Sequence, residues 1–408
     1  MRQGRRLRSA SAPASERPWI ECLPEAGYNC SFMGLSTLSR RAFLGAAAAA
    51  GAAAQTSFSF KVAQTVLPRW RGFNLLDMFQ AFAKQDRKSL LVREEELRWI
   101  RDWGFNFVRF PMDYWLWVDS DWPQTRKLRV EDVLKIKESA LEPVDRMVEL
   151  GRKYGLHVSL NFHRAPGYCV NNPDREPFIL WLDSRAEDAF IYHWDYFAKR
   201  YQGVSEFDLS FNLLNEAPRP REDYMSREDY RRVMTAAVNK IRETSPRRLI
   251  LIDGLETGTS VVDEMIPTGV AQSLHAYWPG GLSHYRASWV DRKGTFPEPT
   301  WPMKKADGTV TASREILEKR IAPWAELARK GIGVHCGECG CYNKTPHAVF
   351  LAWFQDVLEV LESHGIGWAL WNFRGSFGVL DSGRSDVDYE DWYGHKLDRK
   401  LLNLMQRH

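Results

Sequence analysis

Two glutamates follow short apolar segments that have the character of β-strands. Glu216 comes after the run Phe211 to Leu214, and Glu338 ends the run that begins at Gly333. A carboxyl group at the end of such a segment is partly desolvated, and different neighbours push the pKa values of two such groups apart. Hydrolysis of an acetal uses one protonated carboxyl group, which gives its proton to the leaving oxygen, and one ionised carboxylate at the oxocarbenium-like carbon. The sequence offers one candidate for each role.

Six further residues also end predicted strands: Arg109, His163, Asn215, His275, Tyr277 and Trp371. We expect Arg109 to keep one glutamate ionised and Tyr277 to donate a hydrogen bond to the same carboxylate. Asn215 can hold a sugar hydroxyl group, and Trp371 offers a flat apolar face to a pyranose ring. One such residue alone is usually a solvated strand end, but their number indicates a common site.

Metal-ligand patterns are weak in this sequence. His163 and His275 lie on separate predicted strands, without a nearby His-x-His pair or clustered aspartates, so we predict no metal ion and no cofactor. Cys336, Cys339 and Cys341 are close together, but zinc sites usually use two well-spaced pairs of ligands. The sequence favours either buried thiols or one disulfide bond between Cys169 and this group.

The predicted elements that position these residues alternate along the chain. Helical periodicity follows each strand-like run, as in Tyr230, Val233, Ala237 and Ile241. Continuously apolar strands are typical of parallel sheets that helices cover on both faces. The eight expected strands are Gly72 to Leu76, Phe105 to Pro111, His157 to His163, Phe207 to Asn215, Arg248 to Asp253, Ala271 to Tyr277, Gly333 to Glu338 and Gly367 to Phe373.

Eight such units predict an α/β protein that is a single (β/α)₈ TIM barrel. An open doubly wound sheet is the competing fold, but its first strand should open a glycine-rich phosphate loop, and the segment after Gly72 does not. Helix ends agree with the barrel, because a glycine separates a helical run from the next strand at Gly104, Gly155, Gly331 and Gly365.

The charge of the chain is concentrated at its N-terminus. Residues 1–54 hold seven arginines and three glutamates, an excess that equals the net charge of +4 for all 408 residues. The neutral remainder lacks the basic surface that nucleic-acid binding requires, so we expect no nucleic-acid partner. We predict two parts, an N-terminal extension over residues 1–54 and a catalytic domain over residues 55–408.

The extension resembles an export signal. Arg40 and Arg41 precede a mildly apolar run of small residues that ends near Ala54, which is the twin-arginine pattern. A structural helix is the alternative. The run is too short and too weakly apolar for a lasting membrane span. We therefore expect export through the twin-arginine pathway to a periplasmic or extracellular location.

Two long predicted connections are rich in tryptophan and proline. They run from Met112 to Ala140 and from Trp278 to Thr311, on the face of a barrel that carries active sites. Their aromatic side chains form either sugar platforms or buried packing, and the sequence leaves both open. These residues are Trp115, Trp117, Trp122, Trp278 and Trp301.

The order of these motifs resembles the family 5 glycoside hydrolases, the cellulase family of retaining β-glycosidases. The resemblance covers roughly Trp70 to Phe373 and rests on Arg71-Gly72-Phe73-Asn74, Val108-Arg109-Phe110-Pro111, Asn161-Phe162-His163, Leu214-Asn215-Glu216, His275-Ala276-Tyr277, Gly337-Glu338-Cys339-Gly340 and Trp368-Ala369-Leu370-Trp371. It implies that Glu216 is the general acid/base and Glu338 the nucleophile. The other six residues would then surround the glycone-side sugar.

Two positions depart from the family pattern. Ala217 stands between the Asn-Glu pair and Pro218, and Cys339 stands where an aromatic residue commonly follows the nucleophile. We expect a monomeric enzyme that cleaves a β-glucan of the cellulose-like, mixed-linkage or β-1,3 type, with a polysaccharide or oligosaccharide as its substrate. The alternatives are a β-mannanase, an exo-acting β-glucosidase, and a catalytically silent barrel that only binds carbohydrate.

Overall fold

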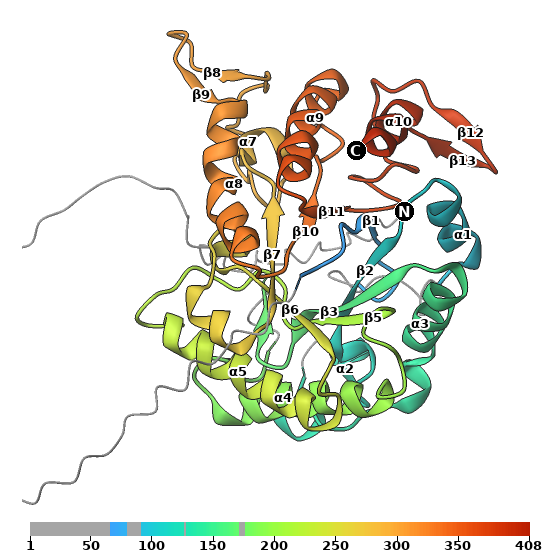
Figure 1. Ribbon diagram of the computed structural model, residues 1–408, viewed down its shortest axis with the longest axis vertical. Helices are drawn as coiled ribbons and strands as arrows, with labels where there is room; N and C mark the ends of the chain where they lie inside the picture. The colour runs from blue at the N-terminus through green and yellow to red at the C-terminus, as the bar shows by residue number, and fades with distance from the viewer. Residues whose placement is uncertain (1–65, 80–90, 126–127, 171–175) are drawn as a thin grey trace, which may run out of the picture. The chain divides into compact units, whose positions relative to one another are not determined.

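Eight parallel strands form the centre of the computed structural model, which describes residues 66–79, 91–125, 128–170 and 176–408 (Figure 1). The strands are β1 (Arg71–Asn74), β2 (Phe107–Asp113), β3 (His157–Ala165), β5 (Leu209–Asn212), β6 (Leu249–Asp253), β7 (Ala271–Ala276), β10 (Val334–Cys339) and β11 (Gly367–Leu370). Their order around the sheet is β2-β1-β11-β10-β7-β6-β5-β3, and β2 also pairs with β3. This pairing closes the sheet and confirms the predicted (β/α)₈ barrel.

All eight expected strands are present, with shifted ends. The largest change is at the fourth, where the expected run Phe207 to Asn215 forms a strand only over Leu209–Asn212. The chain bends after that strand so that Asn215 and Glu216 leave the sheet. The predicted helix ends at Gly104, Gly155, Gly331 and Gly365 all have positive φ angles, as a helix-terminating glycine requires.

Among the described residues, seven long helices cover the outside of the barrel. They are α1 (Glu94–Asp102), α3 (Glu142–Tyr154), α4 (Ser184–Arg200), α5 (Arg227–Thr244), α8 (Arg314–Arg329), α9 (His347–Ser363) and α10 (Arg399–Arg407). The exception lies between β6 and β7, where only the short α6 (Leu255–Gly258) and the 3₁₀ segment η6 (Asp263–Thr268) connect the strands. Shorter elements occupy the loops: η2 (Tyr114–Leu116), α2 (Trp122–Thr125), η3 (Val130–Asp132), η4 (Glu138–Ala140), β4 (Tyr168–Cys169), α7 (Gly280–Ser283), and the hairpins β8–β9 (Met303–Lys304, Val310–Ala312) and β12–β13 (Glu390–Trp392, His395–Leu397).

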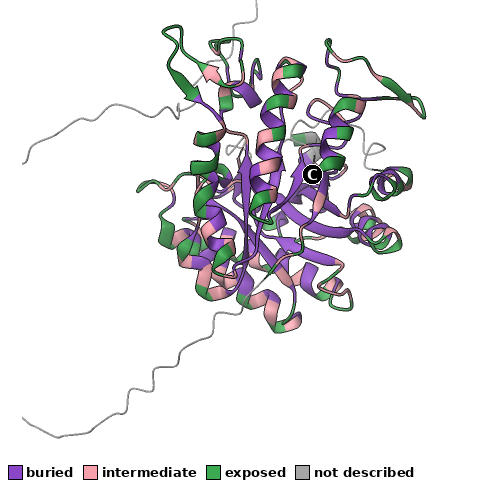
Figure 2. Ribbon diagram, turned by 45° about the horizontal axis from the view of Figure 1, so that its top comes forward, coloured by how far each residue is buried: buried purple, intermediate pink, exposed green. Residues whose placement is uncertain are grey.

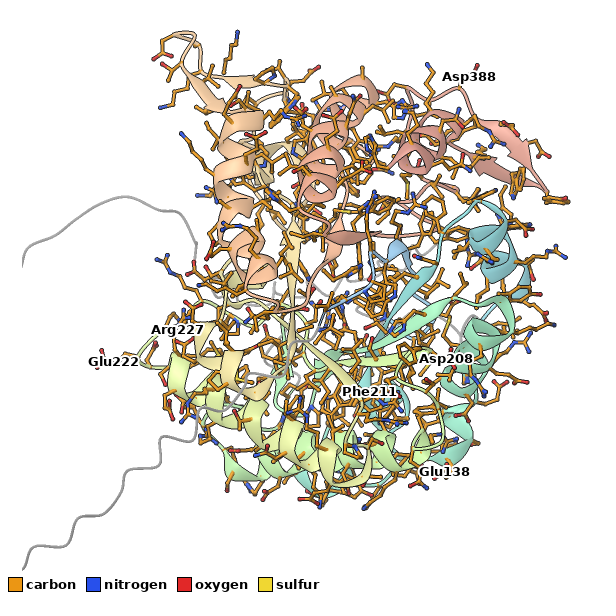
Figure 3. All side chains as sticks on the ribbon, viewed as in Figure 1. Glu138, Asp208, Phe211, Glu222, Arg227 and Asp388 are labelled. Carbon is orange, nitrogen blue, oxygen red and sulfur yellow. The ribbon has the colours of Figure 1, made fainter. Side chains whose placement is uncertain are left out.

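Helix α5 shows how sequence determines these elements. Ser226 and Asp229 form a capping box that satisfies the first backbone N–H groups, and Tyr230 and Val233 begin its buried face. In Figure 2 the central strands are buried, and the exposed parts of the helices face outward. Phe211 of β5 lies among the interior side chains in Figure 3 and is fully buried.

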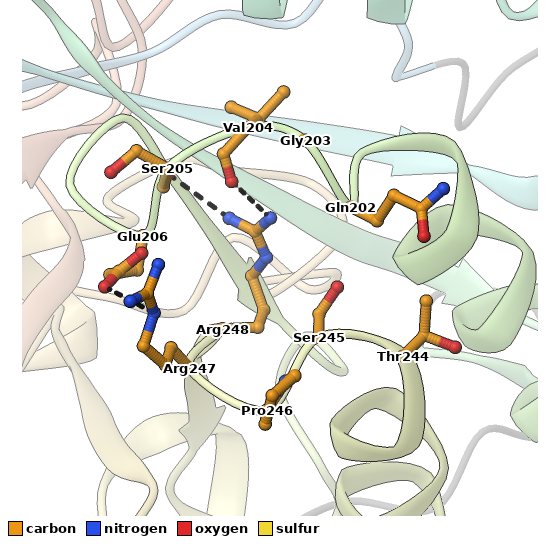
Figure 4. Close-up of a pocket in the computed structure, with 10 residues that line it drawn as sticks. All are labelled: Gln202, Gly203, Val204, Ser205, Glu206, Thr244, Ser245, Pro246, Arg247 and Arg248. Carbon is orange, nitrogen blue, oxygen red and sulfur yellow. Dashed lines mark hydrogen bonds and ion pairs between the residues drawn. The ribbon is translucent and has the colours of Figure 1, made fainter.

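A cavity of about 490 Å³ lies at the amino-terminal end of the strands, between residues 202–206 and 244–248 (Figure 4). Arg248 borders it, and its guanidinium group donates to the carbonyl oxygens of Tyr201, Val204 and Leu209 at 2.9, 2.8 and 2.7 Å. Burial lowers the pKa of Arg248 to about 10. Because Tyr201 caps the carboxyl end of α4, the arginine satisfies carbonyl groups there, which is a stabilising role.

Several expectations about the loops can be resolved. Trp115, Trp117 and Trp122 are at most 2% exposed, so buried packing is the correct interpretation and their role as sugar platforms is wrong. Trp278 and Trp301 are half-buried, and Arg320 covers the Trp278 ring at 4.3 Å.

Cys336, Cys339 and Cys341 are free, fully buried thiols, and Cys169 is also buried.

The membrane and export predictions concern different parts of the chain. None of the described helices is both long and apolar enough to cross a membrane. The twin-arginine signal and the boundary between residues 54 and 55 lie outside the described residues.

Candidate active site

The eight predicted site residues come together at the carboxyl ends of the strands. Arg109, His163, His275 and Glu338 lie within β2, β3, β7 and β10. The others lie just beyond strands: Tyr277 and Trp371 directly follow β7 and β11, and Asn215 and Glu216 lie a few residues after the end of β5. Five of the eight line one cavity of about 290 Å³: His163, Glu216, Tyr277, Glu338 and Trp371. The other three do not line it. Arg109 and His275 contact the glutamates, and Asn215 contacts Arg109.

Glu338 is held by two donors, one on each carboxylate oxygen. Nη1 of Arg109 donates to Oε1 at 2.6 Å, and the Tyr277 hydroxyl group donates to Oε2 at 2.9 Å. Both residues therefore act on the same carboxylate, as the sequence predicts. Burial raises the pKa of Glu338, and the positive charges of His275 and Arg109 oppose that rise. Burial and the nearby carboxylates keep the pKa of Tyr277 well above its usual value, so the hydroxyl group remains a donor.

A strand irregularity aims Glu338 into the barrel. The register between β7 and β10 shifts between Cys336 and Glu338, on either side of Gly337. A Cβ atom at Gly337 would lie 2.5 Å from Oγ of Ser273, so a larger residue at this close approach would force the Ser273 side chain to move. Bulges of this kind redirect side chains next to active sites.

Glu216 has a strained backbone and a more open side chain. Its φ angle is +48°, in the left-handed region that residues with a side chain seldom adopt. The backbone N–H donates to Oδ2 of Asp253 at 3.0 Å, and the Tyr168 hydroxyl group donates to the carbonyl oxygen at 2.5 Å. The side chain is 22% exposed, against 4% for that of Glu338. The two carboxyl groups thus have different surroundings.

The two glutamates are close neighbours across the cavity. Side-chain ligand atoms of Glu216, His275 and Glu338 all lie within 4.8 Å of one another. Nδ1 of His275 is 3.1 Å from Oε1 of Glu216 and 3.7 Å from Oε2 of Glu338. Burial lowers the pKa of His275, but the charges of Glu338 and Asp253 and hydrogen bonds to Asp253 and Glu216 outweigh it, and the pKa is raised well above its usual value.

Beneath the glutamates lies a buried polar network that sequence analysis missed in part. Arg109 donates to three asparagine side chains at 2.8 to 3.0 Å: Asn74, Asn212 and Asn215. Asn212 in turn donates to Asp253 at 2.9 Å. Asp253 ends a predicted strand, as the identified site residues do, and this position was the signal that could have found it. Asn212 ends the observed strand β5 but lies inside the predicted strand Phe207 to Asn215, so the sequence carries no such signal for it.

Aromatic rings form two groups around the cavity. In the first, the rings of His163 and Trp371 stack at 5.2 Å, and Phe79 meets both rings edge-on. The second group is Tyr277, His284, Trp289 and Phe377, which contact one another through edge or tilted ring pairs. Trp289 is 46% exposed and borders the cavity. Composition could not distinguish this tryptophan from the buried ones.

Comparisons with known proteins agree with this arrangement. The model of the cellulase family, glycosyl hydrolase family 5, matches residues 69–376. The chain belongs to glycoside hydrolase family 5. A glycoside hydrolase of known crystal structure is 38% identical, with a TM-score of 0.76 over 83% of this chain and 99% of that chain.

The curated relatives of this family 5 enzyme include an endoglucanase and a cellodextrinase. Endoglucanase C of Acetivibrio thermocellus is 26% identical over 350 residues, which cover 78% of this chain and 95% of the relative. Cellodextrinase A of Ruminococcus flavefaciens is 26% identical over 305 residues, which cover 72% and 83%. The protein is a glycoside hydrolase of the endoglucanase type, as its sequence predicts.

Proposed function

We propose that this family 5 enzyme cleaves a β-glucan with retention of configuration, with Glu338 as nucleophile and Glu216 as general acid/base. The observation that carries the proposal is the proximity of the two carboxyl groups, which have ligand atoms within 4.8 Å of each other. Retaining enzymes place the two groups roughly 5 to 5.5 Å apart, whereas inverting enzymes leave about 6.5 to 9.5 Å for a water molecule.

The contacts of each carboxyl group support its assigned role. The donors Arg109 and Tyr277 stabilise negative charge on Glu338, as a nucleophile requires. Glu216 faces His275 and is more accessible, as a residue that exchanges protons with a leaving group and with water must be. The different surroundings of the two carboxyl groups therefore support Glu338 as the nucleophile and Glu216 as the acid/base residue.

The reaction follows two displacements. Glu338 attacks the anomeric carbon and forms a C–O bond, while the bond to the leaving oxygen breaks and Glu216 gives that oxygen its proton. Water then attacks the same carbon, the bond to Glu338 breaks, and Glu216 takes the proton of the water molecule. Asn215 and His163 have buried nitrogen atoms, Nδ2 and Nδ1, without a partner among the described residues, and we assign them to sugar hydroxyl groups.

The substrate proposal rests on the cavity and on the relatives. A volume of about 290 Å³ accommodates a sugar ring beside the glutamates, and Trp371 offers it a stacking face. Endoglucanase and cellodextrinase relatives favour a β-glucan chain over a β-mannan. An exo-acting β-glucosidase and a silent carbohydrate-binding barrel are the other outcomes of the test. We further propose that the enzyme is a monomer exported by the twin-arginine pathway.

Turnover and product stereochemistry test this proposal. The full chain is assayed on carboxymethyl-cellulose, lichenan, laminarin, glucomannan and an aryl β-glucoside, and NMR identifies the first anomer released. We expect a β-glucan to be cleaved to the β-anomer. Release of the α-anomer would refute retention, and binding without turnover would support the silent barrel.

Azide rescue of the two alanine variants distinguishes the role of Glu338 from that of Glu216. With Glu338→Ala, azide should attack directly and give an α-glycosyl azide, whereas with Glu216→Ala it should intercept the glycosyl enzyme and give a β-glycosyl azide. Glu138→Ala is the matched control, since the Glu138 side chain is 66% exposed and does not border the cavity. The opposite azide products would reverse the assignment.

A further inference from the structure

A fully buried aspartate lies behind the proposed acid/base residue. Asp253 ends β6, and its side chain is 0% exposed. Burial alone would raise its pKa, but the charges of His275 and Arg109 and hydrogen bonds from His275 and Asn212 hold the pKa well below its usual value. Asp253 is therefore a carboxylate in the interior of the protein, where a charged group persists only if nearby charges and hydrogen bonds stabilise it.

One oxygen of Asp253 meets three groups of the site. Oδ2 accepts the backbone N–H of Glu216 at 3.0 Å and lies 3.0 Å from Nε2 of His275 and 3.5 Å from Nη2 of Arg109. The short distance between Nε2 of His275 and Oδ2 brings opposite charges together. The other oxygen accepts the Asn212 amide at 2.9 Å.

The imidazole ring of His275 connects this carboxylate to Glu216. Nε2 faces Asp253, and Nδ1 on the opposite side of the ring faces Oε1 of Glu216 at 3.1 Å. A negative charge beside Nε2 favours a proton on that nitrogen, which leaves Nδ1 able to accept a proton from Glu216 or return it. The ring is also fixed in place, since a Cβ atom at Gly258 would lie only 2.8 Å from its Cγ atom.

We propose that Asp253 is a positioning residue for proton transfer, which keeps His275 protonated at Nε2 so that Nδ1 and Oε1 of Glu216 hold the catalytic proton between them. The inference rests on the proposed role of Glu216. In the first displacement the shared proton passes from this pair to the leaving oxygen, and in the second the pair regains a proton from water. The Nε2 proton does not leave the ring, and Asp253 stays ionised. The same oxygen of Asp253 also secures the strained backbone of Glu216.

Aryl β-glycosides with different leaving groups test this role. Phenyl and alkyl leaving groups need a proton from the acid, whereas 2,4-dinitrophenolate leaves without one. Asp253→Asn keeps the shape of the side chain and removes its charge. We expect kcat/KM to fall about 100-fold for the phenyl glycoside and less than about 5-fold for the dinitrophenyl glycoside. Equal losses on both substrates would overturn the proposal, because they would indicate a general disturbance of the site.

The chain supplies a matched control. Asp398 is also a buried aspartate beside a histidine, with Oδ2 2.7 Å from Nε2 of His347, and it caps α10 away from the cavity. Asp398→Asn should leave the ratio of the two kcat/KM values unchanged. A changed ratio in this variant would mean that removal of a buried charge anywhere in the fold produces the effect.

The protonation of His275 is a second readout that depends neither on turnover nor on the Asp253→Asn variant. NMR of the wild-type chain labelled with nitrogen-15 histidine, with the resonances assigned by comparison with His275→Gln, reports the state of each ring nitrogen. We expect Nε2 to carry a proton across the range of activity. A neutral ring with an unprotonated Nε2 would overturn the proposal. If the wild type cleaves no glycoside while Nε2 is protonated, the proposed function fails and the local assignment stands.

Discussion

Each glutamate of the site is placed by specific hydrogen bonds. Glu338 is clamped by a guanidinium group and a phenol hydroxyl group, whereas Glu216 is held through its backbone. The left-handed φ angle of Glu216 costs on the order of 1 to 3 kcal/mol, which contacts from Asp253 and Tyr168 offset. Strain of this kind collects where function requires an orientation that relaxed backbone does not give.

Trp289 offers a test at the scale of one residue. Its ring borders the cavity and rests edge-on against Tyr342 at 4.8 Å. Because Trp371 belongs to the other aromatic group, we expect Trp289 to stack a sugar beyond the cleavage point. Trp289→Ala should raise KM for cello-oligosaccharides about 5- to 10-fold and change kcat less than about 2-fold.

Steady-state kinetics with cellotetraose and with an aryl β-glucoside measure this effect. Trp289→Phe is the control, since it retains an aromatic face. An equal rise of KM for the aryl glucoside, which reaches less far, would place Trp289 on the glycone side instead.

At the scale of elements, the segment α6 supports the site from behind. Gly258 has a φ angle of +79° and touches the His275 ring, while the N–H of Thr257 donates to the carbonyl oxygen of Ala217 at 2.9 Å. We expect Gly258→Ala to displace His275, to lower kcat at least about 10-fold and to destabilise the fold by about 1 to 3 kcal/mol.

A second glycine separates these two effects. Gly308, in the turn between β8 and β9, has a φ angle of +84° and nothing within 4 Å of an added Cβ atom. Gly308→Ala should lower the melting temperature and leave kcat unchanged. If Gly258→Ala also kept full kcat, the close packing of α6 on His275 would have no catalytic consequence.

The part of the fold that the sequence predicts follows from the spacing of apolar residues in its strands and helices. Apolar strands and amphipathic helices such as α5 are visible in the sequence, and residues at strand ends inherit a common location from the barrel. Burial of individual loop residues is not visible, which is why Trp115 and Trp289 could not be told apart. The role of Asn212 depends on a contact with the neighbouring strand that ends at Asp253, far away in sequence. The 3₁₀ segment η6 stands where alternation alone would predict a full helix.

At the scale of the whole molecule, two sets of buried groups oppose each other as pH changes. Burial raises the pKa values of several carboxyl groups, among them Asp77 to about 6 and Glu96 and Glu176 to about 7. Burial lowers those of several histidines, to about 3 for His157 and His335, to about 4 for His193 and His284, and well below the usual value for His163. The folded state binds more protons at the carboxyl groups and fewer at the histidines than the unfolded state does.

These differences give slopes of opposite sign. The carboxyl groups make the free energy of unfolding fall as pH rises toward about 7, because their folded pKa values lie above the unfolded ones. The histidines make it rise with pH up to their unfolded pKa, near about 6.5. We therefore expect the wild type to show a shallow pH dependence of stability between pH values of about 5 and 7.

Substitution of one of these carboxyl groups, Glu96, should reveal its contribution to the pH dependence of the free energy of unfolding. Glu96 of α1 is 2% exposed at its side chain and pairs at 3.0 Å with Nε of Arg374, three residues after Trp371. Glu96→Gln removes one falling contribution, so stability relative to wild type should rise by about 2 to 3 kcal/mol from about pH 5 to pH 8. Denaturant unfolding at several pH values measures this difference, with the exposed neighbour Glu95→Gln as control. Parallel curves for Glu96→Gln and wild type would show that Glu96 is already ionised at low pH, and that the ion pair with Arg374 outweighs its burial.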